Sequence, residues 1–142
     1  MTNAISAHGT LLKIGDGAVS ESFTTIAEVT NIGGPGLALA ALAATSHSSA
    51  GWQEFVGGLL DGGEVTFSIN YVPTHATHNA TTGLIADMVN RTLRNFQIVF
   101  PNVGATTWSF AALVTGFDPS EPVDEVLTAD VTLKLSGQPT LS

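Results

Sequence analysis

The sequence predicts a mainly β domain with one α-helix. Two segments, residues 64–72 and 127–136, alternate apolar and polar side chains with the period of two that a strand with one buried face requires. A single segment carries apolar residues at helical spacing. The length of 142 residues fits one domain, residues 1–142, because no linker, repeat or shift in composition divides the chain.

The remaining strands follow in order along the chain. Residues 11–14 and 23–31 have a less regular pattern and are separated by the turn-like GDGAVSES. Residues 95–100 and 106–115 alternate well and are joined by PNVGA, whose Pro and Gly predict a hairpin. The segment GGPGLALAALAATS is ambiguous, since its alanines and leucines favour a helix by propensity. Its flanking turn residues and strand-rich surroundings favour a strand, which is our prediction.

The helix is predicted over residues 81–92. Five apolar residues fall on one helical face, and Asn and Thr residues precede them as candidate N-caps. These apolar residues are Leu84, Ile85, Met88, Val89 and Leu93. By contrast, residues 48–63 combine five glycines and several apolar side chains, and they predict a long loop ahead of the strand at residue 64.

Composition limits the possible partners. The net charge of −8 argues against binding nucleic acid through its phosphates. Only 11% of residues are charged while 44% are hydrophobic, so we expect other chains to cover much of the surface. The first residues lack the pattern of a cleavable signal, and no apolar run is long enough to span a bilayer, so we expect no membrane partner. Without cysteines, the chain has no disulfide and no thiolate metal site.

Residues that could carry chemistry are few. His75 and His78 have a spacing that two metal ligands could use, but no third ligand lies near them in the sequence, and we expect polar residues of a loop. Asp124 and Glu125 are adjacent, so on a strand they would point to opposite faces. Asn79 and Asn90 match the glycan acceptor pattern by chance. We expect no catalytic residues, metal or cofactor.

Long strands with unprotected edges instead predict pairing between chains, and such pairing can close the chains into a ring.

Several stretches resemble one known family. They are FTTIAEVTNIGGPGL, TSHSSAGWQEFVGGLLDGGEVTFSINY, TLRNFQIVFPN and TTWSFAALVTGFDPSEPVDEVLTADVTLKLSGQPTL. Together they resemble the major tail, or tail tube, proteins of long non-contractile-tailed bacteriophages and related gene transfer agents. The resemblance covers residues 9–141. The blocks that begin at residues 45 and 114 are its most specific parts.

The resemblance implies a structural virion protein rather than an enzyme. Its fold would be a β-sandwich or barrel-like subunit with one flanking helix, assembling into a hexameric ring with an inner β-barrel. Rings would stack into a tail tube, assembled in the host bacterial cytoplasm, that conducts DNA into the host cell. Implied partners are further copies of the chain and the tape measure, tail tip and tail terminator proteins. Alternatives are another tube-forming protein of the same fold, such as a type VI secretion-like tube or a tail terminator, and a monomeric ligand-binding β-sandwich.

Two sets of site residues follow from this resemblance. Residues 45–63 would form a loop that packs on the neighbouring ring; the alternative is that they cover the subunit's own core as a short helix. The expected inter-ring contacts are Trp52, Glu54, Phe55, Val56, Leu59 and Leu60. Polar faces of two strands would line the lumen, and with one basic side chain among them DNA should pass without stable binding. These lumen candidates are Glu64, Thr66, Ser68, Asn70, Thr128, Asp130, Thr132 and Lys134.

Overall fold

A computed structural model describes residues 2–142, and within them the chain forms nine strands and one helix. The predicted mainly β fold with one flanking helix is confirmed. In chain order the elements are β1 Leu11–Gly15, β2 Phe23–Thr25, β3 Val29–Gly33, β4 Ala38–Ala43, β5 Phe55–Asp61, β6 Glu64–Asn70, α1 Leu84–Val89, β7 Arg94–Val99, β8 Thr107–Ser120 and β9 Thr128–Leu141.

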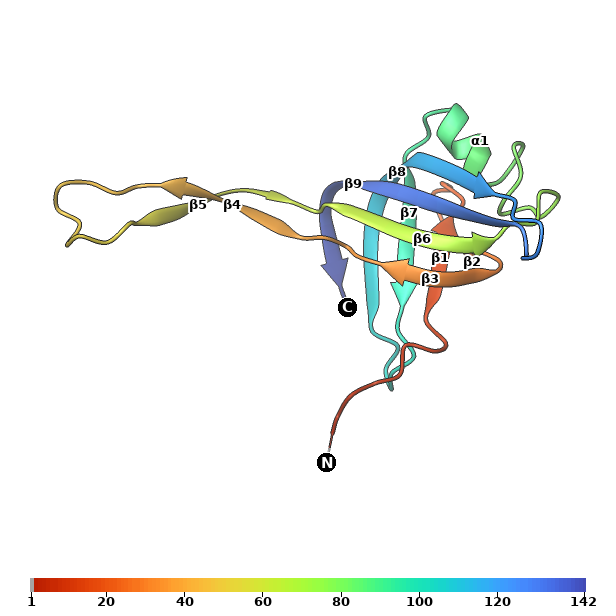
Figure 1. Ribbon diagram of the computed structural model, residues 1–142, viewed down its shortest axis with the longest axis horizontal. Coiled ribbons are helices and arrows are strands. Elements are labelled where there is room, and N and C mark those ends of the chain that lie inside the picture. Colours follow the sequence, from red (N-terminus) through yellow and green to blue (C-terminus); the bar gives the residue numbers. More distant parts are fainter. Residues whose placement is uncertain (1) are drawn as a thin grey trace.

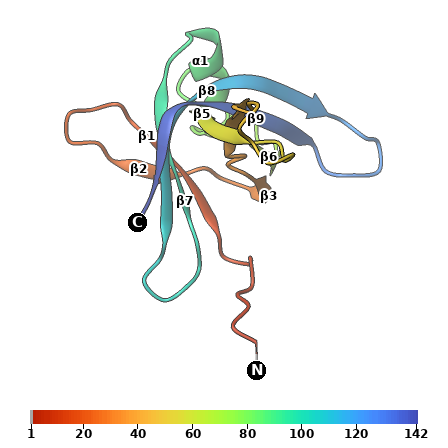
Figure 2. The same ribbon diagram turned by 90° about the vertical axis from the view of Figure 1, so that its left-hand side faces the viewer.

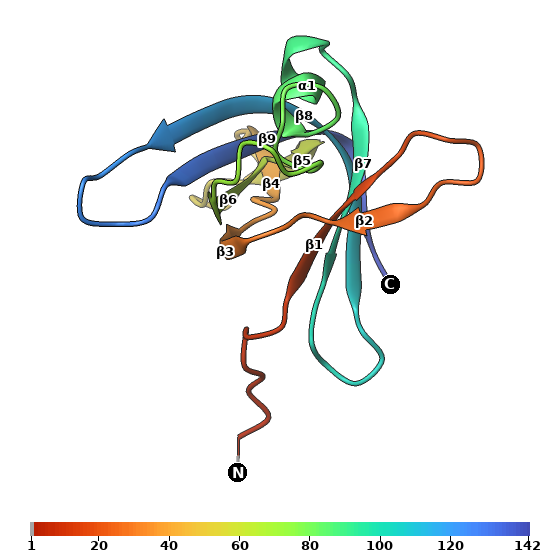
Figure 3. The ribbon, with the colours of Figure 1, turned by 90° about the vertical axis from the view of Figure 1, so that its right-hand side faces the viewer.

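Seven strands form one antiparallel sheet in the order β2-β1-β7-β8-β9-β6-β3, and β4 pairs with β5 alone. The predicted hairpin of β7 and β8 is confirmed. Register shifts between β8 and β9 at Ser109/Ala111 and Val114/Gly116 mark bulges, which bend and twist strands. The long β8 and β9 therefore belong to both halves of the sheet. Figures 2 and 3 show the half with β1, β2 and β7 running across the half with β6 and β3.

The core lies between these two halves. The inward rows predicted from alternation are buried: Val65, Phe67 and Ile69 on β6, and Ala129, Val131, Leu133 and Leu135 on β9. From the other half, Phe96 and Phe110 stack with their ring centroids 5.9 Å apart. Burying this continuous set of apolar side chains drives the folding of the sheet over itself.

The helix α1 lies over β8 and is shorter than predicted (Figure 1). The Asn79 Oδ1 accepts hydrogen bonds from the N–H groups of Thr81, Thr82 and Gly83, which makes a turn of the residues expected to start the helix. The helix ends at Asn90 because Arg91 has a positive φ of 56°. The prediction of residues 81–92 was therefore correct in the position of the helix and wrong in its length.

Two other predictions are corrected. The strand predicted over residues 23–31 is two strands, since the chain turns at residues 27–28, where Glu28 has a φ of 61°. The loop predicted over residues 48–63 is in large part strand β5. It pairs with β4, so the strand prediction for the alanine-rich segment is confirmed. Gly57 and Gly58 suggested a loop. Gly58 instead allows β4 and β5 to approach closely, because a Cβ there would lie 3.1 Å from the backbone oxygen of Ala40.

Candidate assembly surface

The hairpin of β4 and β5, residues 37–61, projects from the body as an arm (Figure 1). Its apolar side chains lack cover from the rest of residues 2–142: Trp52 is 79% exposed and Leu59 is 87% exposed. Phe55, Val56 and Leu60 are exposed as well. A lone two-stranded hairpin is marginally stable in water, and exposed apolar patches of this kind mark interaction sites. The alternative that these residues cover the subunit's own core as a helix is wrong.

The arm's direction is set where β5 meets β6. Gly63 has a φ of 71°, and a Cβ there would collide with the carbonyl oxygen of Gly36, so only glycine fits. The Gly63 N–H donates to Asp61 Oδ1 at 3.0 Å. This hydrogen bond, followed by the charge of Lys134, lowers the pKa of Asp61 from its ordinary value of 3.8.

All eight lumen candidates lie on one face and oppose one another in four pairs. Glu64 pairs with Lys134, Thr66 with Thr132, Ser68 with Asp130 and Asn70 with Thr128. The Ser68 hydroxyl donates to Asp130 Oδ1 at 2.7 Å. We call this surface the polar face. Sequence alternation predicted each row of side chains separately, and the structure joins the two rows.

The polar face is acidic. On its β8 side Asp118 lies opposite Asp130, and on its β3 side Asn31 lies opposite Ser68. Glu28 accepts a hydrogen bond from the Asn70 amide at the end of β6. Lys134 is the one cation among the paired residues, and two acids, Glu64 and Asp61, are its neighbours. The electrostatic field of this face is therefore negative.

Two unpaired strand edges flank the polar face. Within residues 2–142, β3 pairs only with β6, and β8 beyond Ala112 pairs only with β9. The four strands β3, β6, β9 and β8 alternate in direction, so the two free edges run antiparallel to each other. Such edges are ready to pair with another chain.

The lambda phage tail tube protein family matches residues 8–142 of this sequence. The chain belongs to that family. It is therefore a tail tube protein, as the resemblance implied. Comparison with curated protein sequences yields no match.

Solved structures agree with this tail tube fold. The chain is similar to one in the tail of an empty gene transfer agent particle refined with C6 symmetry, at 19% identity and a TM-score of 0.73, covering 98% of this chain and 99% of that one. It is similar to a chain of the SPP1 tail tube, at 13% identity and a TM-score of 0.67, covering 93% and 75%. It is also similar to a chain in the sheath-tube complex of an extracellular contractile injection system, at 13% identity and a TM-score of 0.69, covering 100% and 93%.

The tail tube protein uses His78 in its core. His78 is fully buried, its Nδ1 accepts from the Val72 N–H at 3.1 Å, and its Nε2 lies 2.8 Å from the Ala27 oxygen. These partners assign the proton to Nε2 and occupy both ring nitrogens. Among residues 2–142 no three His, Asp or Glu side chains are grouped to hold a metal ion. The His-x-x-His spacing gave no sign of this burial.

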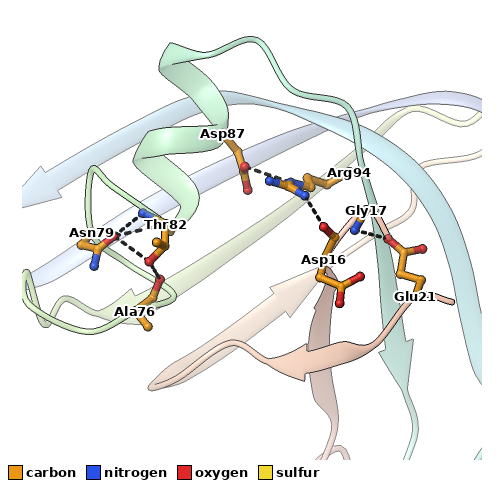
Figure 4. Close-up of polar contacts among 9 residues, drawn as sticks. Asp16, Gly17, Glu21, Ala76, Asn79, Thr82, Asp87 and Arg94 are labelled. Atoms are coloured by element: carbon orange, nitrogen blue, oxygen red, sulfur yellow. Dashed lines mark hydrogen bonds and ion pairs between the residues drawn. The ribbon is translucent and has the colours of Figure 1, made fainter. Parts of the chain in front are cut away.

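A second polar cluster was also missed by sequence reasoning (Figure 4). The Arg94 Nε lies 3.0 Å from Oδ1 of the buried Asp87, and its Nη1 donates to the backbone carbonyl oxygen of Asp16 at 2.9 Å. Arg94 thus joins α1 and β7 to the β1–β2 turn of the tail tube protein, and its contacts are structural. Along the described chain, no helix has the length and apolarity needed to cross a membrane.

Proposed function

We propose that this chain is the repeating subunit of a tail tube, assembling as hexameric rings that stack into a channel through which DNA passes into the host cell. The observation that supports this most strongly is the polar face, because it combines polar side chains, negative charge and two unpaired edges on one side of the fold. The C6 symmetry of the similar gene transfer agent tail supports six copies in a ring.

Ring closure follows from the strand directions. The β8 edge of one copy and the β3 edge of the next run antiparallel, so their pairing continues the antiparallel ladder from copy to copy. Repeated around a ring, this pairing closes an inner barrel in which each copy supplies β3, β6, β9 and β8. Closure removes both of the free edges that flank the polar face. The polar faces then line the lumen, and the apolar cores lie behind them.

The arm would connect consecutive rings. Strand β5 has seven residues, so the arm reaches about 20 Å or more from the body at roughly 3.3 Å per residue. Its apolar side chains need a partner, and in this proposal the body of a copy in the next ring covers them. The residues that form this contact are Trp52, Glu54, Phe55, Val56, Leu59 and Leu60. The role of the protein in this proposal is mechanical and not catalytic. Its further partners are the tape measure protein inside the tube and the tail tip and terminator proteins at the ends of the tube.

A conduit for DNA must not retain it. A phosphate neutralised by a lysine or arginine adds affinity that depends on salt concentration. The polar face offers only Lys134, which has acidic neighbours, so phosphates in the lumen meet net negative charge. We propose that DNA passes without stable binding.

Electron microscopy of the purified protein tests the assembly. We expect rings or open tubes with a central channel, because ring-to-ring contacts repeat along an axis and do not close. A protein that stays monomeric at high concentration, even with tail tip components present, would contradict the proposal. Single rings that cap tube ends without stacking would instead identify a tail terminator.

A further inference from the structure

The two ends of the polar face differ in shape. Along β9, the register pairs Thr128 with Asn70 at one end and Lys134 with Glu64 at the other, about 20 Å away at roughly 3.4 Å per residue. The β8–β9 connection, residues 121–127, lies at the Thr128 end, and we call it the distal loop. The arm leaves from the Lys134 end, and Figure 1 shows the arm and the distal loop on opposite sides of the body.

The distal loop carries apolar side chains without cover. Val123 is 99% exposed and Val126 is 63% exposed. Within residues 2–142, no hydrogen bond or ion pair involves the side chains of Glu121, Asp124 or Glu125. The loop therefore presents two valines and three unpaired carboxylates at the end of the face.

The body has two large open cavities. One, of about 710 Å³, lies under the N-terminal segment. The other lies at the Lys134 end beside the arm, and we call it the base cavity. This base cavity has a volume of about 640 Å³ and lies where β9 bends past the arm. Its apolar lining consists of Leu37, Ala38, Leu39, Leu60, Leu135 and Pro139, with two glycines between them. Gln138 and Asp61 also line it, and Lys134, whose side chain is 43% exposed, pairs with that Asp61.

We propose that the distal loop of one copy seats its valines in the base cavity of a copy in the adjacent ring. The inference rests on the proposed stacking of rings. Stacking by repetition along one axis places the Thr128 end of one ring against the Lys134 end of the next, a heterologous contact in which the two surfaces must fit each other. One surface is an uncovered apolar loop, and the other is an open apolar cavity.

The position of the cavity also favours this occupant. The cavity is continuous with the arm, so the loop and the arm together form one interface between rings. A second copy therefore supplies the uncovered apolar side chains that this cavity can accept.

Cysteine cross-linking in the assembled protein tests the contact, and the chain has no native cysteine to interfere. The variant with both V123C and Q138C should form tubes that, once oxidised, run as a ladder of covalent multimers in denaturing electrophoresis. Each chain would be bonded to one in the next ring. The matched control pairs V103C with Q138C, because Val103 is equally exposed but lies in the β7–β8 turn, and it should give no ladder.

The outcomes separate this inference from the proposed function. Tubes of the V123C and Q138C variant that give no ladder overturn the loop contact and leave the tail tube function standing. Wild-type protein that forms no tubes overturns both.

A charge substitution gives a second measurement. V123D should raise the protein concentration needed for tube assembly by about tenfold or more, since a charge would enter an apolar cavity. V103D should leave that concentration unchanged, and both variants should keep the wild-type circular dichroism spectrum. An unchanged assembly concentration for V123D would contradict the proposal.

Discussion

The ammonium group of Lys134 lies 3.5 Å from Oδ1 of Asp61, and this pair joins the polar face to the base of the arm. Lys134 is also directly opposite Glu64 on the neighbouring strand. The one cation on the paired rows is thus close to two carboxylates. Because both partners of the ion pair are partly exposed, its effect on stability is small, and its main consequence is electrostatic.

The acidic polar face predicts that wild-type subunits and tubes do not bind duplex DNA at physiological salt. Repulsion acts within a Debye length of about 8 Å under these conditions. Fluorescence anisotropy with labelled duplex checks this, and micromolar, salt-sensitive binding by the wild type would contradict it. The variant with both T66K and T132K provides a positive control, since its two added cations lie opposite each other on the same face and should bring measurable, salt-dependent binding.

Truncating the arm's aromatic side chains should impair assembly and spare the fold. W52A and F55A each remove interface contacts worth on the order of 2 kcal/mol, while neither side chain is buried in the subunit. Thermal unfolding should show an unchanged Tm, and electron microscopy should show few tubes. V19A, at another exposed apolar residue in the β1–β2 turn, should assemble like the wild type. A collapse of the Tm in W52A would mean that the Trp52 indole is part of the subunit's own core.

Stability should fall in acid, partly through Asp61 and Asp16. The Gly63 N–H and Lys134 lower the pKa of Asp61, and the Ala18 N–H is the largest cause of the lowered pKa of Asp16. A carboxyl whose pKa is lower in the folded state contributes stability above its unfolded value of 3.8, and this contribution is lost as the pH falls through the folded pKa. Urea unfolding at pH 7 and pH 3 should therefore show a smaller acid loss for D61N than for wild type. An equal loss in both proteins would contradict the assignment.

His78 should matter for folding and not for metal binding. H78A leaves the Val72 N–H without its partner and opens a cavity in the core, and should lower the free energy of unfolding by about 2–5 kcal/mol. H75A should cost much less, since His75 is exposed and, within residues 2–142, its ring accepts a hydrogen bond only from Thr77 in its own turn. Chemical denaturation measures both. Added zinc should leave the wild-type Tm unchanged, and a rise would indicate that the two histidines bind metal.

Strands with one buried face could be predicted from the sequence because their signal is local. Alternation over residues 64–72 and 127–136 identified β6 and β9 and the correct buried rows. The position of the helix was also evident from the spacing of Leu84, Ile85 and Met88. The arm was only partly predictable. Its exposed apolar side chains follow no burial pattern, since nothing within residues 2–142 covers them, and Gly57 and Gly58 are residues typical of a loop.

The sequence by itself determined the β content, the helix position, the acidic and weakly charged composition and the family resemblance. Tertiary structure alone decided that Glu64 faces Lys134, that β3 and β8 provide free edges of opposite direction, and that Arg94 and His78 join segments far apart in the chain. The physical reason is the range of the interactions. Alternation and propensity act between neighbouring residues, whereas register, edges and buried polar contacts depend on which distant strands pair when the apolar rows are buried together.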